Sequence, residues 1–219
     1  MEETVRVVER TGSRSEELAA SQLQDQQSRA DLDIDIARAQ EYALLAALLL
    51  RVPDDQLLER LACLPGDETP LGVAHRSLAQ AATLSSHETL VQDYFRLFIG
   101  VGRGEILPFA SYYLTGFLQS RPLAILRDDL GRLGLQRADF HHDPEDHIGT
   151  LCEVMSNLAS DRERFPLADE RRFFERHLSP WAIRFFTDLE SVRDARFYAA
   201  VGTLGRVFTN IEAEAFALN

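Results

Sequence analysis

The sequence SSHETLVQDYFRLFIGVGRGEILPFASYYLTG, residues 85–116, predicts a helix, a glycine-rich turn and a second apolar segment, in that order. Ser85 and Glu88 stand three residues apart, which is the pattern of a capping box and predicts that a helix begins here. Apolar side chains follow on one helical stripe, at Leu90, Val91, Tyr94, Leu97 and Phe98. Glycines at positions 100, 102 and 104 end the helix. The stripe is either plain core or one wall of a groove for a peptide.

Helical periodicity continues on both sides of this stretch, with prolines and glycines between the periodic segments. Pro70 and Pro122 suit the first turn of a helix, and Gly134 suits the end of one. No window alternates between apolar and polar residues as a half-buried strand does. The expected fold is all-α, a multi-helix bundle with helices at residues 33–51, 54–64, 70–83, 85–99, 112–119, 122–133, 144–158, 167–178, 179–190 and 194–219.

The chain is expected to divide into a tail and two helical parts. Residues 1–30 are polar and poorly periodic, which predicts a mobile tail with at most one loose helix. An N-terminal helical subdomain is expected at 31–134 and a C-terminal one at 144–219, joined by a hinge at 135–143. With 219 residues, the chain is long enough for one sizeable core or for two closely packed subdomains.

The charge balance is acidic, with 35 Asp and Glu against 23 basic residues and a net charge of −12. This balance argues against nucleic acid as a partner, because duplex binding depends on cationic side chains that neutralise phosphates. It is compatible with a cationic partner. Cys63 and Cys152 lie far apart in apolar helical segments, which favours buried thiols of a reducing compartment over a disulfide. The first residues lack a secretion signal, and the most apolar run, 42–50, is too short to cross a bilayer. We therefore expect a cytoplasmic protein without membrane insertion.

Two segments invite comparison with known ligand sites. The glycine-rich segment 100–105 follows a helix rather than a strand and lacks the Gly-Lys-Ser/Thr of a phosphate-binding loop, so we interpret it as a turn. The segment 141–147 holds His and acidic residues, but no second cluster stands at a metal-site spacing. Asp143 is expected to cap a helix that begins at Pro144, which would place Glu145 and Asp146 in its first turn. Neither a metal nor a cofactor is expected.

Catalysis has little support in the sequence. There is no nucleophile elbow, no HExxH and no Cys-His constellation at a supporting spacing. Asp146 and His147 could act as an acid–base pair, but neighbouring helical side chains point about 100° apart. We therefore expect a protein that is not an enzyme.

Residues 94–116 and 144–155 resemble the two signature regions of the TorD/DmsD family of redox-enzyme maturation chaperones, to which NarJ-type proteins are related. The first reads YFRLFIGVGRGEILPFASYYLTG, with the family's aromatic-x-x-Leu-Phe-x-Gly-x-Gly followed by Glu and a leucine-proline pair. The second reads PEDHIGTLCEVM, with the family's Glu-x-Asp-His. The Phe/Trp-rich segment 173–189 is similar to the C-terminal half of that family, and the likeness covers roughly residues 35 to 215.

The resemblance implies an all-helical cytoplasmic chaperone without enzymatic activity. Its partners would be the apo form of a molybdopterin-containing oxidoreductase and the twin-arginine signal peptide of that enzyme, which the chaperone withholds from export while the cofactor is inserted. Guanine-nucleotide binding, suggested for some members, has no independent support in these residues. The signal-peptide and client-binding residues implied by the resemblance are Leu97, Phe98, Glu105, Pro108, Tyr112, Asp146 and His147.

Several alternatives stay open at this point. The apolar part of the peptide is expected to lie against the wall formed by Leu97 and Phe98, with Glu105 and Asp146 setting its orientation. The rival interpretation is a helical interaction or scaffold module whose stripe is simply core. The client could be an S- or N-oxide reductase or a formate dehydrogenase, and the chaperone a monomer or a domain-swapped homodimer.

Overall fold

The computed structural model of the chain describes residues 11–136 and 144–218, mostly as backbone alone between residues 11 and 28. Within these ranges the chain is helical and forms no strand, which confirms the predicted all-α class; an isolated antiparallel β-bridge pairs Phe109 with His147. The elements are α1 (Thr11–Leu50), α2 (Asp55–Ala62), α3 (Pro70–Thr83), α4 (His87–Tyr94), the π-helical turn η1 (Phe95–Ile99), α5 (Ala110–Thr115), α6 (Arg121–Arg132), α7 (Ile148–Ser160), α8 (Leu167–His177), α9 (Ala182–Glu190) and α10 (Arg196–Leu218).

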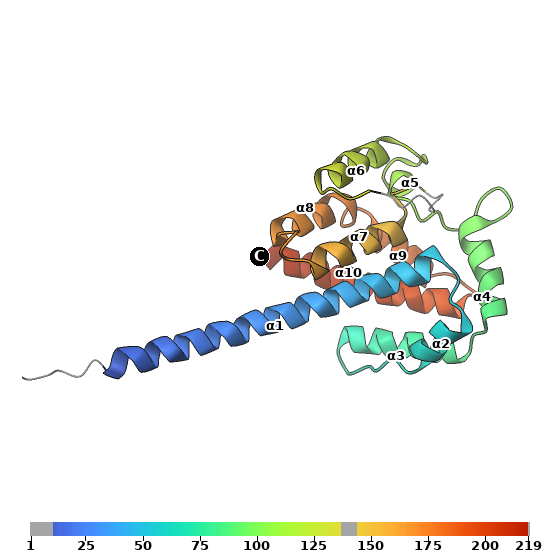
Figure 1. Cartoon of the computed structure of the whole chain (residues 1–219). Coiled ribbons are helices and arrows are strands. Elements are labelled where there is room, and N and C mark those ends of the chain that lie inside the picture. Colours follow the sequence, from blue (N-terminus) through green and yellow to red (C-terminus); the bar gives the residue numbers. More distant parts are fainter. Residues whose placement is uncertain (1–10, 137–143, 219) are drawn as a thin grey trace, which may run out of the picture.

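Apolar side chains from both halves of the chain form one continuous core. Leu45 of α1 and Met155 of α7 belong to the same buried cluster, and α1 packs along α7. The helix α10 packs against both α9 and α3, so it joins the end of the chain to its first half (Figure 1). The two predicted subdomains therefore share a core, and the segment 137–143 of the predicted hinge lies outside the described residues.

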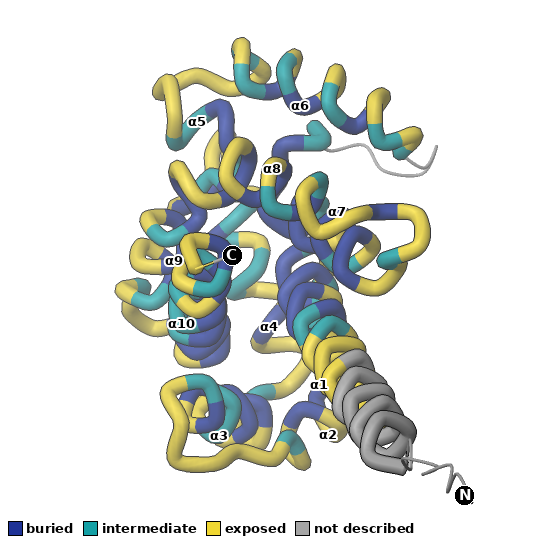
Figure 2. Tube along the Cα trace, turned by 90° about the vertical axis from the view of Figure 1, so that its left-hand side faces the viewer, coloured by how far each residue is buried: buried dark blue, intermediate teal, exposed yellow. Residues whose placement is uncertain are grey.

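The helix α1 is much longer than expected and leaves the body of the molecule. It begins at Thr11 rather than at residue 33, because Glu, Leu, Ala, Gln and Arg dominate this segment and all of them favour helix. Leu32 and Ile34 are exposed, whereas from Ala39 onward one face of the helix is buried. The N-terminal half accordingly projects beyond the body, and the C-terminal half lies in the core (Figures 1 and 2).

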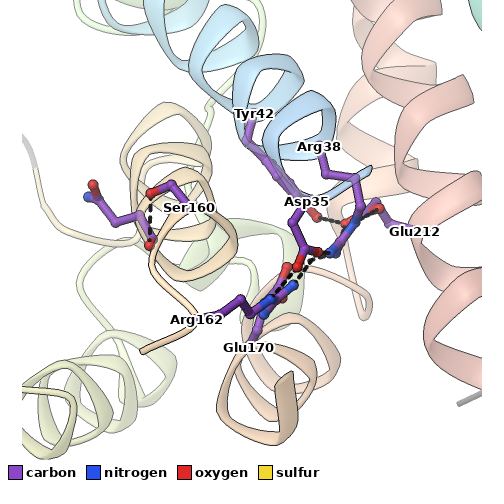
Figure 3. A network of polar contacts seen from close by, with 8 residues as sticks. Asp35, Arg38, Tyr42, Ser160, Arg162, Glu170 and Glu212 are labelled. Atoms are coloured by element: carbon purple, nitrogen blue, oxygen red, sulfur yellow. Dashed lines mark hydrogen bonds and ion pairs between the residues drawn. The ribbon is translucent and has the colours of Figure 1, made fainter. Parts of the chain in front are cut away.

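A network of charged side chains marks the point where α1 enters the body (Figure 3). Arg38 of α1 lies 2.7 Å from a carboxylate oxygen of Glu170 in α8 and 2.6 Å from one of Glu212 in α10, and both acids are buried. Arg162 binds Asp35 of α1 and Glu170, each at 2.5 Å. Buried carboxylates require such partners, because an unpaired charge is costly away from water. The network therefore fixes α1 against α8 and α10.

Several helix ends differ from the expected ones for local reasons. Ser86, not Ser85, caps α4 by accepting a hydrogen bond from the Thr89 amide, while the Ser85 hydroxyl donates to the Ala81 carbonyl at the end of α3. The helix expected at 112–119 is α5, which begins at Ala110 and ends early because Gly116 adopts the left-handed conformation, with φ at 80°. In the described part of the chain, no helix is both long and apolar enough to span a bilayer.

Candidate functional site

The loop after η1 folds back against the helix that precedes it. Gly100 has a φ of 63° and ends the π-helical turn. The amides of Glu105 and Ile106 then donate to the carbonyls of Arg96 and Leu97, at 3.2 and 2.8 Å. Gly104 makes this approach possible, because a Cβ at that position would lie 2.5 Å from the Leu97 carbonyl oxygen. The glycines of the first signature region therefore bring Glu105 back beside η1.

The two signature regions meet directly at the start of α5. The Ala110 amide donates to the main-chain carbonyl of Asp146, and the Ser111 amide donates to the Asp146 carboxylate at 2.8 Å. The Ile148 amide donates in turn to the Pro108 carbonyl. The first amides of a helix lack partners within the helix, so Asp146 serves as the acceptor that anchors α5. Asp146 is 1% exposed and lines a small, mostly apolar pocket of about 130 Å³.

His147 is the N-cap of α7, which corrects the predicted start of that helix. Its Nδ1 accepts the Gly149 amide at 3.0 Å, and the Phe109 ring lies edge-on at 5.3 Å between ring centroids. The expected first turn at Pro144 is wrong, because the segment before Ile148 pairs with residues 108–111 rather than continuing the helix; Glu145 binds Arg127 instead. Burial lowers the pKa of His147 to about 4, so its imidazole is neutral at physiological pH.

The predicted apolar wall is largely closed. Leu97 has no exposed surface and belongs to the core, and Phe98 is half-buried with its ring edge-on to Tyr94 and Tyr198. Pro108 is also buried. Val91, which the sequence places on the buried stripe, is instead 43% exposed. With Leu97 buried, only part of the Phe98 side chain is left at the surface of the predicted wall.

Glu105 and Tyr112, by contrast, lie in one open cleft of about 560 Å³. One side of the cleft comes from η1, the loop after it and α5. The other side comes from the end of α9 and the loop to α10, where Asp188 and Asp194 are exposed acids. Sequence reasoning missed these two acids: Asp188 is a polar residue within the apolar helix α9, and Asp194 lies in the short polar segment after it. Three carboxylates and two arginines, Arg96 and Arg193, thus line a cleft that opens to solvent.

Hydrogen bonds fix the groups that line this cleft. Arg96 binds Glu105 at 2.8 Å, and this bond raises the pKa of Arg96. The Tyr113 hydroxyl donates to Asp188 at 2.8 Å; burial, together with this bond, raises the pKa of Tyr113. The Arg103 guanidinium donates to the Tyr112 hydroxyl and lies 5.3 Å from the centre of its ring. Such a cleft suits a ligand with several cationic hydrogen-bond donors.

The structure separates the remaining predicted site residues from this cleft. Asp146 lines the smaller pocket, and His147 is buried behind Phe109. Among the described residues, no three His, Cys, Asp or Glu side chains are placed to hold a metal ion, while residues 141–143 of the His-Asp cluster lie outside that range.

The fold defines the class of protein first: an all-α protein whose helices are arranged as in a known crystal structure. A crystal structure from Archaeoglobus fulgidus, described as a proposed redox enzyme maturation protein, superposes with a TM-score of 0.52. It is 20% identical in sequence and covers 80% of this chain and 93% of its own, a likeness that shows the fold alone.

The sequence comparisons then identify the family. The family model described as nitrate reductase delta subunit matches residues 64–187, more than half of the chain. The chain belongs to this family, which includes the TorD/DmsD maturation chaperones. The chaperone TorD of Shewanella loihica is 26% identical over 202 residues, which are 82% of this chain and 92% of that protein. A protein described as a Tat proofreading chaperone, DmsD of Haemophilus influenzae, is 26% identical over 132 residues, 59% of this chain and 63% of its own.

The family assignment confirms the resemblance stated from the two signature regions. It also establishes that the chain is a maturation chaperone and not a catalytic enzyme.

Proposed function

We propose that this chaperone binds the twin-arginine signal peptide of a molybdopterin-containing oxidoreductase, and that the cleft beside Glu105 and Tyr112 receives the basic part of that peptide. The observation that carries the proposal is the position of these two signature residues on one open cleft with Asp188 and Asp194. The DmsD relative, described as a Tat proofreading chaperone, supports a role in the same export route.

The chemistry of the cleft matches the chemistry of the peptide. A pair of arginines carries two guanidinium groups, and carboxylates bind guanidinium through two parallel hydrogen bonds. An exposed pair contributes only about 0–1 kcal/mol, so affinity requires several acids acting together. Glu105, Asp188 and Asp194 supply three, and the net charge of −12 attracts a basic peptide over a longer range.

Binding in this manner would hold the signal peptide away from the export machinery. The apoenzyme would then stay in the cytoplasm long enough to receive its molybdenum cofactor. The chaperone itself needs no cofactor for this task, since the interaction uses only its own carboxylates and aromatic rings.

Calorimetric titration with a synthetic twin-arginine peptide tests the proposal. The double variant Glu105→Gln, Asp188→Asn should bind about tenfold more weakly than the wild type, because it loses two charge-assisted contacts. The loss should shrink as salt is added, since exposed charges are screened. Glu175→Gln is the matched control, because Glu175 is an exposed acid on α8 that binds an arginine, as Glu105 does.

An unchanged affinity in the double variant would remove the cleft from the binding site. A second control uses a peptide with both arginines replaced by glutamine. Wild type and double variant should bind this peptide equally weakly, because the acids then have no partner.

A further inference from the structure

A row of exposed apolar side chains follows the outward face of α4 and η1. Val91, Phe95 and Ile99 recur every fourth residue and are 43%, 46% and 54% exposed, and Val101 at the tip of the next loop is 97% exposed. These four residues are called the outer stripe. At the right-hand edge of Figure 1, α4 stands with no other element on its outer side. A cluster of large apolar side chains in water marks an interaction surface.

The outer stripe and one side of the cleft are formed by the same segment of the chain. Phe95 and Arg96 are neighbours in η1, and Arg96 lines the cleft together with Glu105. The loop that carries Val101 at its tip returns to η1 at Glu105. A ligand with a basic head joined directly to an apolar helix could therefore bind in the cleft and on the outer stripe at once.

We propose that the outer stripe binds the apolar segment of the client's signal peptide as a helix, while the cleft binds its basic head. This inference rests on the function proposed above and adds the surface that recognises the apolar part. It differs from the sequence-based expectation, which assigned that part to Leu97 and Phe98. Leu97 is buried in the core and Phe98 is half-buried against Tyr94 and Tyr198, so these two residues expose less apolar surface than the outer stripe does.

Charge favours this occupant over a second copy of the chain. The acids Glu88, Asp93 and Glu105 lie along the same segment as the outer stripe; Arg96 is engaged by two of them, and Arg103 donates to the Tyr112 hydroxyl. A second copy carries the same net charge of −12 and would bring like charges together. A signal peptide brings an apolar helix next to a positive charge, which complements both features.

The test titrates two synthetic peptides into the full-length chain. One is a complete twin-arginine peptide, and the other is its basic head without the apolar segment. Phe95→Ser should weaken binding of the complete peptide at least ~10-fold and leave binding of the basic head unchanged, as expected for an aromatic anchor. The difference between the two peptides isolates the apolar contact in the manner of a double-mutant cycle.

Two further variants keep the test informative if Phe95→Ser unfolds the protein. Val101→Ser changes a side chain that is almost wholly exposed, so the variant should fold as the wild type does. Its binding of the complete peptide should weaken roughly several-fold. Leu167→Ser is the matched control, because Leu167 is 42% exposed at the start of α8, far from α4 in Figure 1. It should bind both peptides as the wild type does.

The outcomes separate this inference from the proposed function. If the wild type binds the complete peptide and the outer-stripe variants bind it equally well, the outer stripe is not the site, while the cleft keeps its role. If the wild type binds neither peptide, both proposals fail. If sedimentation shows a wild-type dimer that Phe95→Ser converts to monomer without loss of peptide affinity, the outer stripe joins two copies and the inference is overturned.

Discussion

His147 illustrates how position changes the chemistry of a single side chain. An exposed histidine would titrate near neutral pH, but this ring is enclosed behind Phe109 and accepts the Gly149 amide through Nδ1. The proton of the neutral ring therefore resides on Nε2. Burial disfavours the charged form and lowers the pKa to about 4.

This pKa predicts a dependence of stability on pH. Between pH 6.5 and about 4, the unfolded chain binds a proton at His147 that the folded chain does not. Its contribution is therefore complete above pH 6.5 and is lost as the pH falls toward 4, by roughly 3 kcal/mol at most. His147→Asn retains an acceptor for the Gly149 amide but removes the titration. Urea unfolding at several pH values measures the free energy of unfolding. Between pH 6.5 and about 4, this free energy should change less steeply with pH in the variant than in the wild type.

Two other histidines also contribute to the pH dependence of stability. Burial lowers the pKa of His177 as well, so its contribution has the same sign, whereas the hydrogen bond that His75 donates to Glu41 raises the pKa of His75 and gives the opposite sign. His177 and His75 are unchanged in His147→Asn, so their contributions are the same in the wild type and the variant. If the free energy of unfolding depends on pH equally in wild type and variant, His147 does not titrate in this range.

The sequence singled out candidate residues but did not indicate the contacts that they make. The likeness to two signature regions singled out Asp146 and His147, but their burial depends on contact with residues 108–111, some 35 positions earlier. No local pattern reports such a contact. Glu105 and Tyr112 line an open cleft, while Asp188 and Asp194, which line it too, carry no sequence signal beyond their polarity.

At the scale of elements, Asp146 anchors α5 to the start of α7. Asp146→Ala would leave the Ser111 amide buried without its acceptor, at a cost of about 1–3 kcal/mol in the free energy of unfolding. Asp146→Asn retains an acceptor oxygen and should cost less. Chemical unfolding measures both changes, and peptide affinity should fall with them because α5 carries Tyr112 of the cleft.

One outcome would contradict this account of Asp146. If Asp146→Ala is as stable as the wild type but loses peptide affinity, the carboxylate must contact the ligand itself.

Helix boundaries were predictable where the local chemistry determines them. The helix expected at residues 70–83 is found with those bounds, because Thr69 caps it and Pro70 fits its first turn. The start of α7 was predicted wrongly, since Asp143-Pro144 has the same local pattern but tertiary pairing with Phe109 sets the real start. Local signals therefore identified the helices, and tertiary contacts moved some of their ends.

At the scale of the whole molecule, the charged network around Arg38 joins distant parts of the chain. Burial opposes the charged form of Arg38, but its hydrogen bonds to Glu212 and Glu170 raise its pKa, so the side chain stays charged. Arg38→Ala would leave two buried carboxylates without this partner and should lower the free energy of unfolding by about 3–5 kcal/mol.

A surface arginine provides the matched control for this measurement. Arg171 binds Glu175 one helical turn away at 3.0 Å, and Arg171→Ala should cost only about 0–1 kcal/mol. Both variants are compared by urea unfolding at neutral pH. A similar small loss in Arg38→Ala would mean that the network does not hold α1 against the body.

The projecting half of α1 has a consequence for measurements of size. Some 24 residues before Asp35 extend the helix by about 35 Å at 1.5 Å per residue. A projecting helix increases the hydrodynamic radius of a protein more than its mass. A single chain should therefore elute early from a size-exclusion column, at the position of a heavier compact protein. Early elution is therefore not evidence that this chaperone forms a dimer, and its mass should be measured by light scattering.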